Sequence, residues 1–81
     1  MASLQALQDS FRQGLALPST FDVTKAESGN LRQWDSVAHL QLVVAIEDAF
    51  AVRLSPAEVI ELKSYPAAVG ILRRHGVWRD A

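Results

Sequence analysis

The chain has 81 residues, of which 49% are hydrophobic, and its formal net charge at pH 7 is −1. This length allows one small globular domain with a modest core, and the composition is too apolar for a disordered chain. The balanced charge argues against non-specific nucleic-acid binding, which needs a basic surface. Because the sequence has no cysteine, disulfides, thiolate catalysis and thiolate metal sites are excluded.

Membrane and export segments are not expected. No apolar run approaches the ~20 residues that a membrane span needs. The first residues lack the basic and apolar stretches of a secretion signal. We therefore expect a soluble, cytoplasmic protein.

The first predicted element is a helix from about Ser3 to Gly14. Ser3 is expected to cap its start, and Gly14 is expected to end it. Its large apolar residues recur at steps of three and four, which places them on one face that should be buried: Leu4, Leu7, Phe11 and Leu15.

The periodicity disappears from Leu17 to Asp35. A connection of this length without structure is uncommon in a compact domain, so it indicates either a function or an element that the pattern does not reveal. We expect an ordered loop that three apolar residues hold to the core: Phe21, Val23 and Leu31.

A second helix is predicted from about Ser36 to Ala51, directly after Asp35. Aspartate and serine are both preferred at helix N-termini. Successive residues lie about 100° apart around a helix, which divides this one into two faces. The expected core stripe consists of His39, Leu42, Val43, Ile46 and Phe50. The expected water-facing side consists of Val37, Gln41, Val44, Glu47 and Asp48, with Leu40 at the border.

The water-facing side combines apolar and acidic residues near the serine. Leaving Val37 and Val44 exposed forgoes the ~1.5–3 kcal/mol that burial of each would contribute. Scattered surface valines are ordinary and need no explanation. The alignment of these two with Glu47, Asp48 and Ser36 nevertheless favours a docking surface.

Two further helices are predicted in the C-terminal part. Ser55-Pro56-Ala57-Glu58 combines a capping box with proline at the first helical position, and predicts a short helix to about Leu62. Ser64-Tyr65-Pro66 starts a fourth helix that carries Val69 and Leu72 inward and ends near Gly76. No segment alternates long enough to form a sheet.

The expected fold class follows from these elements. It is all-α: a small four-helix bundle of three main helices and one short helix, with a long ordered loop between the first and second. A single domain should cover residues 1–81.

Trp34-Asp35-Ser36-Val37, followed by Ile46-Glu47-Asp48-Ala49-Phe50 and by Val52 to Val59, resembles the acyl carrier proteins, a phosphopantetheine-binding family, in their stand-alone form. The similarity is strongest from about Leu31 to Leu72. In that family, the serine of an Asp-Ser-Leu motif receives a 4′-phosphopantetheine arm from coenzyme A. The thiol of this arm holds acyl groups as thioesters while partner enzymes act on them.

The resemblance assigns roles to individual residues. It implies that Ser36 is the attachment site for 4′-phosphopantetheine and that Asp35 supports the transferase at this site. It also implies a partner-binding face made of Val37, Gln41, Val44, Glu47 and Asp48.

The resemblance further implies a monomeric carrier that is not an enzyme and binds no metal. Its partners would be a phosphopantetheinyl transferase, an acyl- or aminoacyl-loading enzyme and downstream biosynthetic enzymes. A chain without cysteine cannot supply its own thiol, so a borrowed thiol on a flexible arm suits it.

Several residues depart from the pattern of the fatty-acid carriers. Val37 replaces the usual leucine, and the nearly neutral chain has Gln41 on the docking face. Gln33-Trp34 stands where peptidyl carriers usually have Gly-Gly, which favours the acyl type. The C-terminal end is basic: Arg73, Arg74, His75 and Arg79. These differences favour a specialised pathway, such as polyketide, lipopeptide or modified-amino-acid biosynthesis, over fatty-acid synthesis, and leave the cargo open between fatty acyl, polyketide and aminoacyl groups.

Simpler interpretations stand beside the carrier. Ser36 would then be only an N-cap, and His39 is expected to be a partly buried packing residue rather than a base for Ser36. Trp34 and Trp78 are expected to anchor the core edge, and His75 with its neighbouring arginines to form a solvated helix end. The alternative function is a non-catalytic helical adaptor that binds a partner through the Val37/Val44 face without a prosthetic group.

Overall fold

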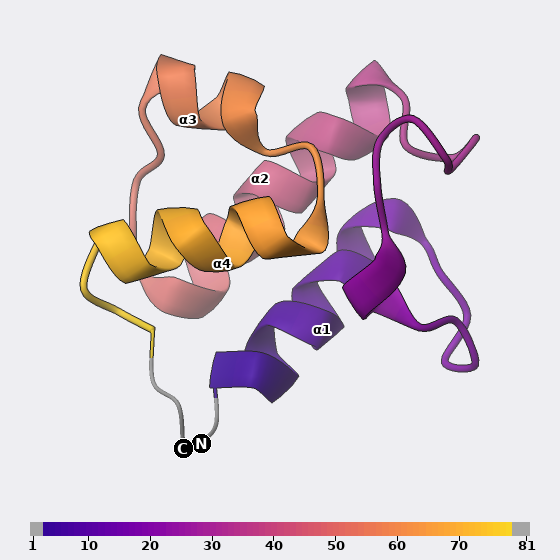
Figure 1. The fold of residues 1–81 in the computed structure, drawn as a ribbon, viewed down its shortest axis with the longest axis horizontal. Helices are drawn as coiled ribbons and strands as arrows, with labels where there is room; N and C mark the ends of the chain where they lie inside the picture. Colours follow the sequence, from indigo (N-terminus) through magenta and orange to yellow (C-terminus); the bar gives the residue numbers. More distant parts are fainter. Residues whose placement is uncertain (1–2, 79–81) are drawn as a thin grey trace.

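The computed structural model describes residues 3–78, which form four α-helices and one short 3-10 helix. The elements in chain order are α1 (Ser3–Leu15), η1 (Val23–Lys25), α2 (Ser36–Phe50), α3 (Pro56–Glu61) and α4 (Tyr65–Arg74). In Figure 1, α1 and α2 lie side by side, α4 crosses in front of α2, and α3 lies at the upper edge. The all-α prediction is confirmed for the described residues. None of their helices is long and apolar enough to cross a membrane.

The backbones of α1 and α2 touch at Gly14. A Cβ atom added to Gly14 would lie 2.6 Å from the Cα atom of Leu42 and 2.9 Å from its backbone nitrogen. Gly14 does not end the helix, contrary to the prediction, because the helix continues to Leu15 and Ala16 follows with a left-handed φ of 54°. The glycine is needed because no side chain fits between the two helices at this point.

Small residues also explain why Leu4 is 48% exposed although it was expected in the core. The buried stripe of α1 contains Ser3, Ser10 and Gly14 besides the large apolar residues. A pattern of large apolar residues does not include these small ones. The buried face of α1 is therefore rotated toward the small residues relative to the predicted face, and Leu4 is left partly exposed.

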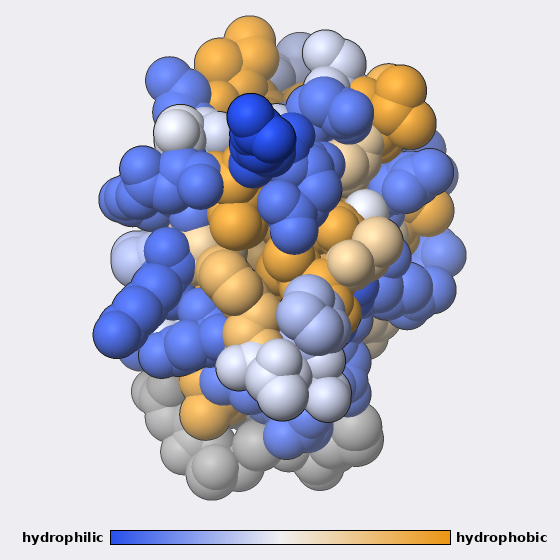
Figure 2. Space-filling view, turned by 90° about the vertical axis from the view of Figure 1, so that its right-hand side faces the viewer, coloured by the Kyte–Doolittle hydropathy of each residue, from blue (hydrophilic) through white to orange (hydrophobic). Residues whose placement is uncertain are grey.

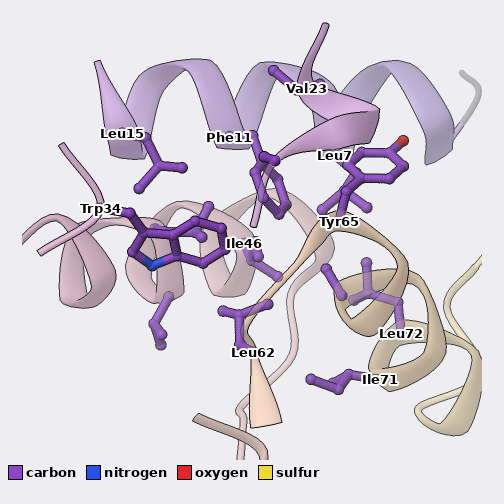
Figure 3. Close-up of a cluster of buried hydrophobic side chains, with 14 of the residues drawn as sticks. Leu7, Phe11, Leu15, Val23, Trp34, Ile46, Leu62, Tyr65, Ile71 and Leu72 are labelled. Carbon is purple, nitrogen blue, oxygen red and sulfur yellow. The ribbon is translucent and has the colours of Figure 1, made fainter. Parts of the chain in front are cut away.

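Aromatic rings fill the centre of the core (Figure 3). The Phe11 ring is fully buried, 5.8 Å from the Trp34 ring in an edge-on arrangement and 5.4 Å from the Tyr65 ring. Aliphatic side chains from every α-helix except α3 complete the core, together with residues of the connecting segments: Leu7, Leu15, Val23, Leu42, Ile46, Leu54, Leu62, Ile71 and Leu72.

The connection between α1 and α2 contains an element that the sequence pattern did not reveal. Asp22 caps the 3-10 helix η1 by accepting a hydrogen bond from the backbone N–H of Thr24 at 3.1 Å. Val23 is buried, and Phe21 and Leu31 pack half-buried against the core. An isolated antiparallel bridge between Glu27 and Ser64 ties this connection to the start of α4.

The helix boundaries in the C-terminal part follow the predicted capping residues. Ser55 accepts a hydrogen bond from the Glu58 N–H at 3.2 Å, and Glu58 accepts one from the Ser55 N–H at 2.9 Å, so the capping box of α3 is confirmed. Ser64 caps α4 at the Ala67 N–H. The preceding helix, α2, ends at Phe50, and its C-cap Ala51 has a left-handed φ of 53°.

Candidate functional site

The start of α2 separates capping from the exposed serine hydroxyl. Asp35 is the N-cap, and its carboxylate accepts a hydrogen bond from the Ala38 N–H at 2.9 Å. Ser36 is the first residue of the helix and is exposed to solvent. The interpretation of Ser36 as the N-cap is therefore wrong. Because the Asp35 side chain already provides the capping hydrogen bond, the Ser36 hydroxyl is not needed as a cap.

A polar chain of three residues lies directly beside this serine. The Trp34 indole Nε1–H donates to Nδ1 of His39 at 2.9 Å, and Nε2 of His39 lies 2.7 Å from the Val59 carbonyl oxygen of α3. Indole nitrogen can only donate, so Nδ1 accepts and Nε2–H donates to the carbonyl. Both nitrogens of His39 are thus engaged, and neither is available as a base for Ser36.

A pocket of about 570 Å³ opens next to Ser36, between the start of α2 and α3. Its lining is largely apolar, and Ile60 on its rim is 70% exposed. Lys63 and Ser28 add polar groups to the lining. The full lining consists of Ser28, Trp34, Asp35, Ser36, His39, Leu40, Val59, Ile60, Leu62 and Lys63.

The outer face of α2 is apolar along its first half. Val37 is 64% exposed, Leu40 is 61% exposed and Val44 is 55% exposed, while Gln41 and Asp48 beside them are also exposed. Figure 2 looks at the side of the molecule that carries the α1–α2 connection, where apolar side chains extend across a surface bordered by polar ones. A second depression of about 520 Å³ separates this face from Gln13 and Gly14 of α1.

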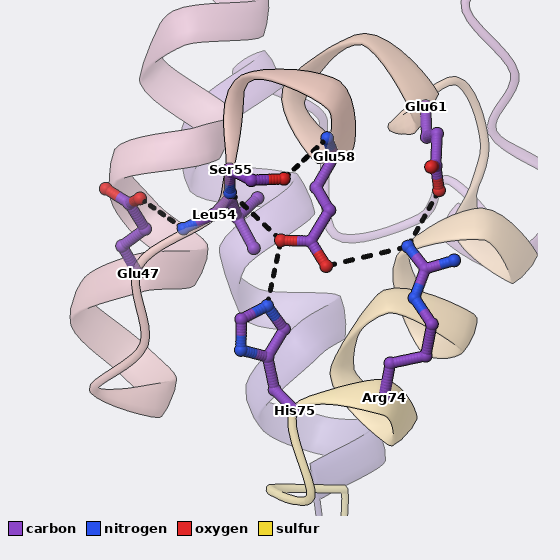
Figure 4. A network of polar contacts seen from close by, with 7 residues as sticks. All are labelled: Glu47, Leu54, Ser55, Glu58, Glu61, Arg74 and His75. Carbon is purple, nitrogen blue, oxygen red and sulfur yellow. Dashed lines mark hydrogen bonds and ion pairs between the residues drawn. The ribbon is translucent and has the colours of Figure 1, made fainter.

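Glu47 does not belong to this exposed face. Its carboxylate is half-buried and accepts a hydrogen bond from the Leu54 N–H at 2.8 Å (Figure 4). The chain turns back after Ala51 and brings this N–H to the last turns of α2. The expected water-facing position therefore holds for Asp48, which is exposed, but not fully for Glu47, which is engaged with the segment after α2.

The basic end of α4 is engaged with α3 (Figure 4). His75 Nε2 lies 2.9 Å from a carboxylate oxygen of Glu58, and Arg74 donates to Glu61 at 2.7 Å and lies 3.6 Å from Glu58. The hydrogen bond from the Ser55 N–H, followed by that with His75, lowers the pKa of Glu58 to about 2. Arg74 is exposed, as expected of a solvated helix end, although it is ion-paired, whereas His75 is half-buried against Glu58, contrary to the expectation. Arg79 lies outside the described residues.

Both tryptophans belong to the hydrophobic core or pack against it. Trp34 is buried rather than at the core edge, and Trp78 packs half-buried against the core. Within residues 3–78, no three histidine or acidic side chains are grouped so that they could hold a metal ion.

No protein-family model, no curated protein sequence and no solved structure matches this chain.

Proposed function

We propose that this protein is a discrete acyl carrier whose Ser36 bears a 4′-phosphopantetheine arm. The observation that carries the proposal is the exposed Ser36 hydroxyl at the first position of α2, which Asp35 relieves of capping. It occurs within the Trp34–Val37 segment that resembles the attachment motif of the carrier family. The arm would supply the thiol that the chain lacks, and this thiol would hold the cargo as a thioester.

The attachment chemistry suits Ser36. In the transferase, Ser36 Oγ would form a bond to the phosphorus next to the pantetheine of coenzyme A. The pyrophosphate P–O bond would break and release adenosine 3′,5′-bisphosphate, and the serine proton would pass to a base of the transferase. The free N–H groups and the positive end of the α2 dipole favour the resulting negative phosphodiester.

The surroundings of Ser36 also fit partner binding. Val37 and Val44 present apolar area that folding does not use, and Gln41 and Asp48 lie beside them. We assign the transferase and the loading enzyme to this face. In this proposal Asp48 steers encounter electrostatically, and Glu47 supports the face by holding the turn at Leu54.

We further propose that the helices form the four-helix bundle of the carrier family, and that the protein is a cytoplasmic monomer that acts in specialised biosynthesis. These proposals rest on the resemblance and on the departures at Val37 and Gln41. In this role the protein itself catalyses no step. The half-buried His39, with both nitrogens bonded, agrees with that absence of catalysis.

The test is the intact mass of the protein after incubation with coenzyme A and a broad-specificity phosphopantetheinyl transferase. We expect the mass to increase by one phosphopantetheine. Ser36→Ala should abolish the gain and remain folded, because Asp35 keeps the cap. The matched control is Ser28→Ala, an exposed serine that lines the same pocket, and it should load normally.

Two outcomes would contradict the proposal. A gain of mass on Ser36→Ala would place the arm elsewhere. An unchanged mass of the folded wild-type protein would favour the adaptor, which binds a partner through the Val37/Val44 face alone.

A further inference from the structure

Helix α3 is held by polar contacts and by the partly buried Val59, which packs against the core. It has six residues, and none of them is buried. On one side, Glu58 and Glu61 bind His75 and Arg74 of the α4 end (Figure 4). On its other side, the Val59 carbonyl oxygen accepts the hydrogen bond from His39.

The His39 contact satisfies a helix end from outside the helix. Val59 is among the last four residues of α3, whose carbonyls have no partner within the helix. The imidazole of His39 provides that partner from α2. The same ring is stacked on Trp34 with 24° between the planes, and Trp34 meets the buried Phe11 edge-on. A continuous line of contacts thus joins α3 to the centre of the core.

This line forms part of the wall of the pocket beside Ser36. Trp34 and His39 line one side, and Val59 and Ile60 of α3 line the other. The distance between α2 and α3 therefore sets the width of the pocket. The hydrogen bond from His39 to the Val59 carbonyl oxygen joins these two walls.

We propose that His39 is a positioning residue that holds α3 against α2 and thereby sets the size of the apolar group that the pocket beside Ser36 admits. The apolar group is the acyl part of the cargo, so its source rests on the proposed function. The ion pairs of Glu58 and Glu61 stay in place when the His39 bond breaks. Helix α3 then moves away at its Val59 side and remains attached at the α4 side.

Two substitutions separate the two hydrogen bonds of His39. In His39→Gln, the amide nitrogen reaches the position of Nε2 and can still donate to the Val59 carbonyl. In His39→Asn, the shorter amide reaches only the position of Nδ1. Its oxygen can still accept from the Trp34 indole, but the side chain no longer reaches the Val59 carbonyl. His39→Leu removes both bonds and keeps apolar packing, and it replaces His39→Asn if that variant fails to fold.

The first measurement is backbone amide hydrogen exchange of the unmodified protein. In His39→Asn, the amides at the end of α3 should exchange about fivefold faster, as the loss of one hydrogen bond predicts, with those of α1 unchanged. His39→Gln should restore the wild-type rates. Equal α3 rates in the wild type and His39→Asn would overturn the proposal.

The second measurement is binding of free butyryl-, octanoyl- and dodecanoyl-pantetheine to the unmodified protein, followed by the methyl NMR signals of Val59 and Ile60. The wild type and His39→Gln should prefer the same chain length, and His39→Asn should shift the preference to a longer chain. The methyl signals of Val44, on the outer face of α2, serve as the control. An unchanged preference in His39→Asn would overturn the proposal.

These measurements do not need a loaded Ser36. A protein that binds acyl-pantetheine with the expected His39 dependence and yet takes up no phosphopantetheine would refute the carrier function and leave the role of His39 standing. A protein that loads normally and has the same chain-length preference in all variants would refute the role of His39 alone.

Discussion

The α1–α2 pair and helix α3 are held in place by different forces. The first depends on direct backbone contact at Gly14 and on fully buried apolar side chains such as Phe11. The second has no fully buried residue, and besides the partly buried Val59 it is held by ion pairs and hydrogen bonds. Apolar packing has no charge that protonation can change or salt can screen, whereas polar attachments respond to both. We therefore expect the pair of helices that carries Ser36 to be more resistant to changes of pH and salt than α3 beside it.

The largest effect is expected from Phe11→Ala, which removes the ring at the centre of the α1–α2 pair. Because Phe11 is fully buried between Trp34 and Tyr65, the free energy of unfolding should fall by ~3–5 kcal/mol. Urea denaturation measures this loss. Leu4→Ala on the same helix is the control and should cost well under half as much, because Leu4 is 48% exposed. Equal losses would mean that the core is not centred on Phe11.

The next effect concerns the contact between the two helices. Gly14→Ala places a methyl group 2.6 Å from the Leu42 Cα atom, so α1 and α2 must move apart at a cost of about 1–3 kcal/mol. Gly70→Ala is the matched control within α4, since nothing lies within 4 Å of its added Cβ. The control should stabilise the protein by about 0.5–1 kcal/mol. Thermal unfolding that moves in the same direction for both variants would refute the close approach.

A smaller effect is expected at the polar attachment of α3. The pKa of Glu58 is lowered from its usual 4.5 to about 2, so the folded state favours the carboxylate. The stability that it contributes is present above pH 4.5 and is lost as the pH falls toward 2. Glu58→Gln should destabilise the protein by about 1 kcal/mol at pH 7 and flatten the decline between these pH values. Parallel stability curves of variant and wild type would show that Glu58 contributes nothing to this decline.

The smallest effect on stability is expected on the exposed face of α2. Val44 is 55% exposed, so Val44→Asp should change the free energy of unfolding by less than about 0.5 kcal/mol. The same substitution should slow phosphopantetheine transfer to Ser36, because it puts a charge into the apolar docking face. The initial rate of mass gain measures this. A normal transfer rate would remove Val44 from the face, and an unfolded variant would show that the face is part of the core.

The elements that were predictable from the sequence are those that local chemistry determines. The capping box of Ser55 and Glu58 and the proline after Ser55 act within one helical turn, and α3 begins where they place it. The apolar repeat of α1 likewise predicts the burial of Leu7 and Phe11. Such local interactions form in the same way whatever the rest of the fold is.

The features that were missed depend on distant parts of the chain. Gly14 has its role only because Leu42 of another helix lies against it. Glu47 is half-buried because the chain after α2 turns back and its Leu54 N–H binds the Glu47 carboxylate. His75, at the end of α4, contacts Glu58 of α3. A glycine or a glutamate on a predicted helix gives no sign of such partners. At the candidate site, the motif identified Ser36, but the assignment of the cap to Asp35 required the backbone conformation at residue 35.

The left-handed alanines that follow α1 and α2 leave room to strengthen this protein by design. Ala16 and Ala51 adopt a backbone conformation that costs an ordinary residue about 1 kcal/mol and that glycine adopts freely. Ala51 is exposed and lies at the far end of α2, about 20 Å along the axis from Ser36. A more heat-resistant version of the domain could therefore be built by relaxing this turn, without altering any surface that a partner enzyme would meet near the serine.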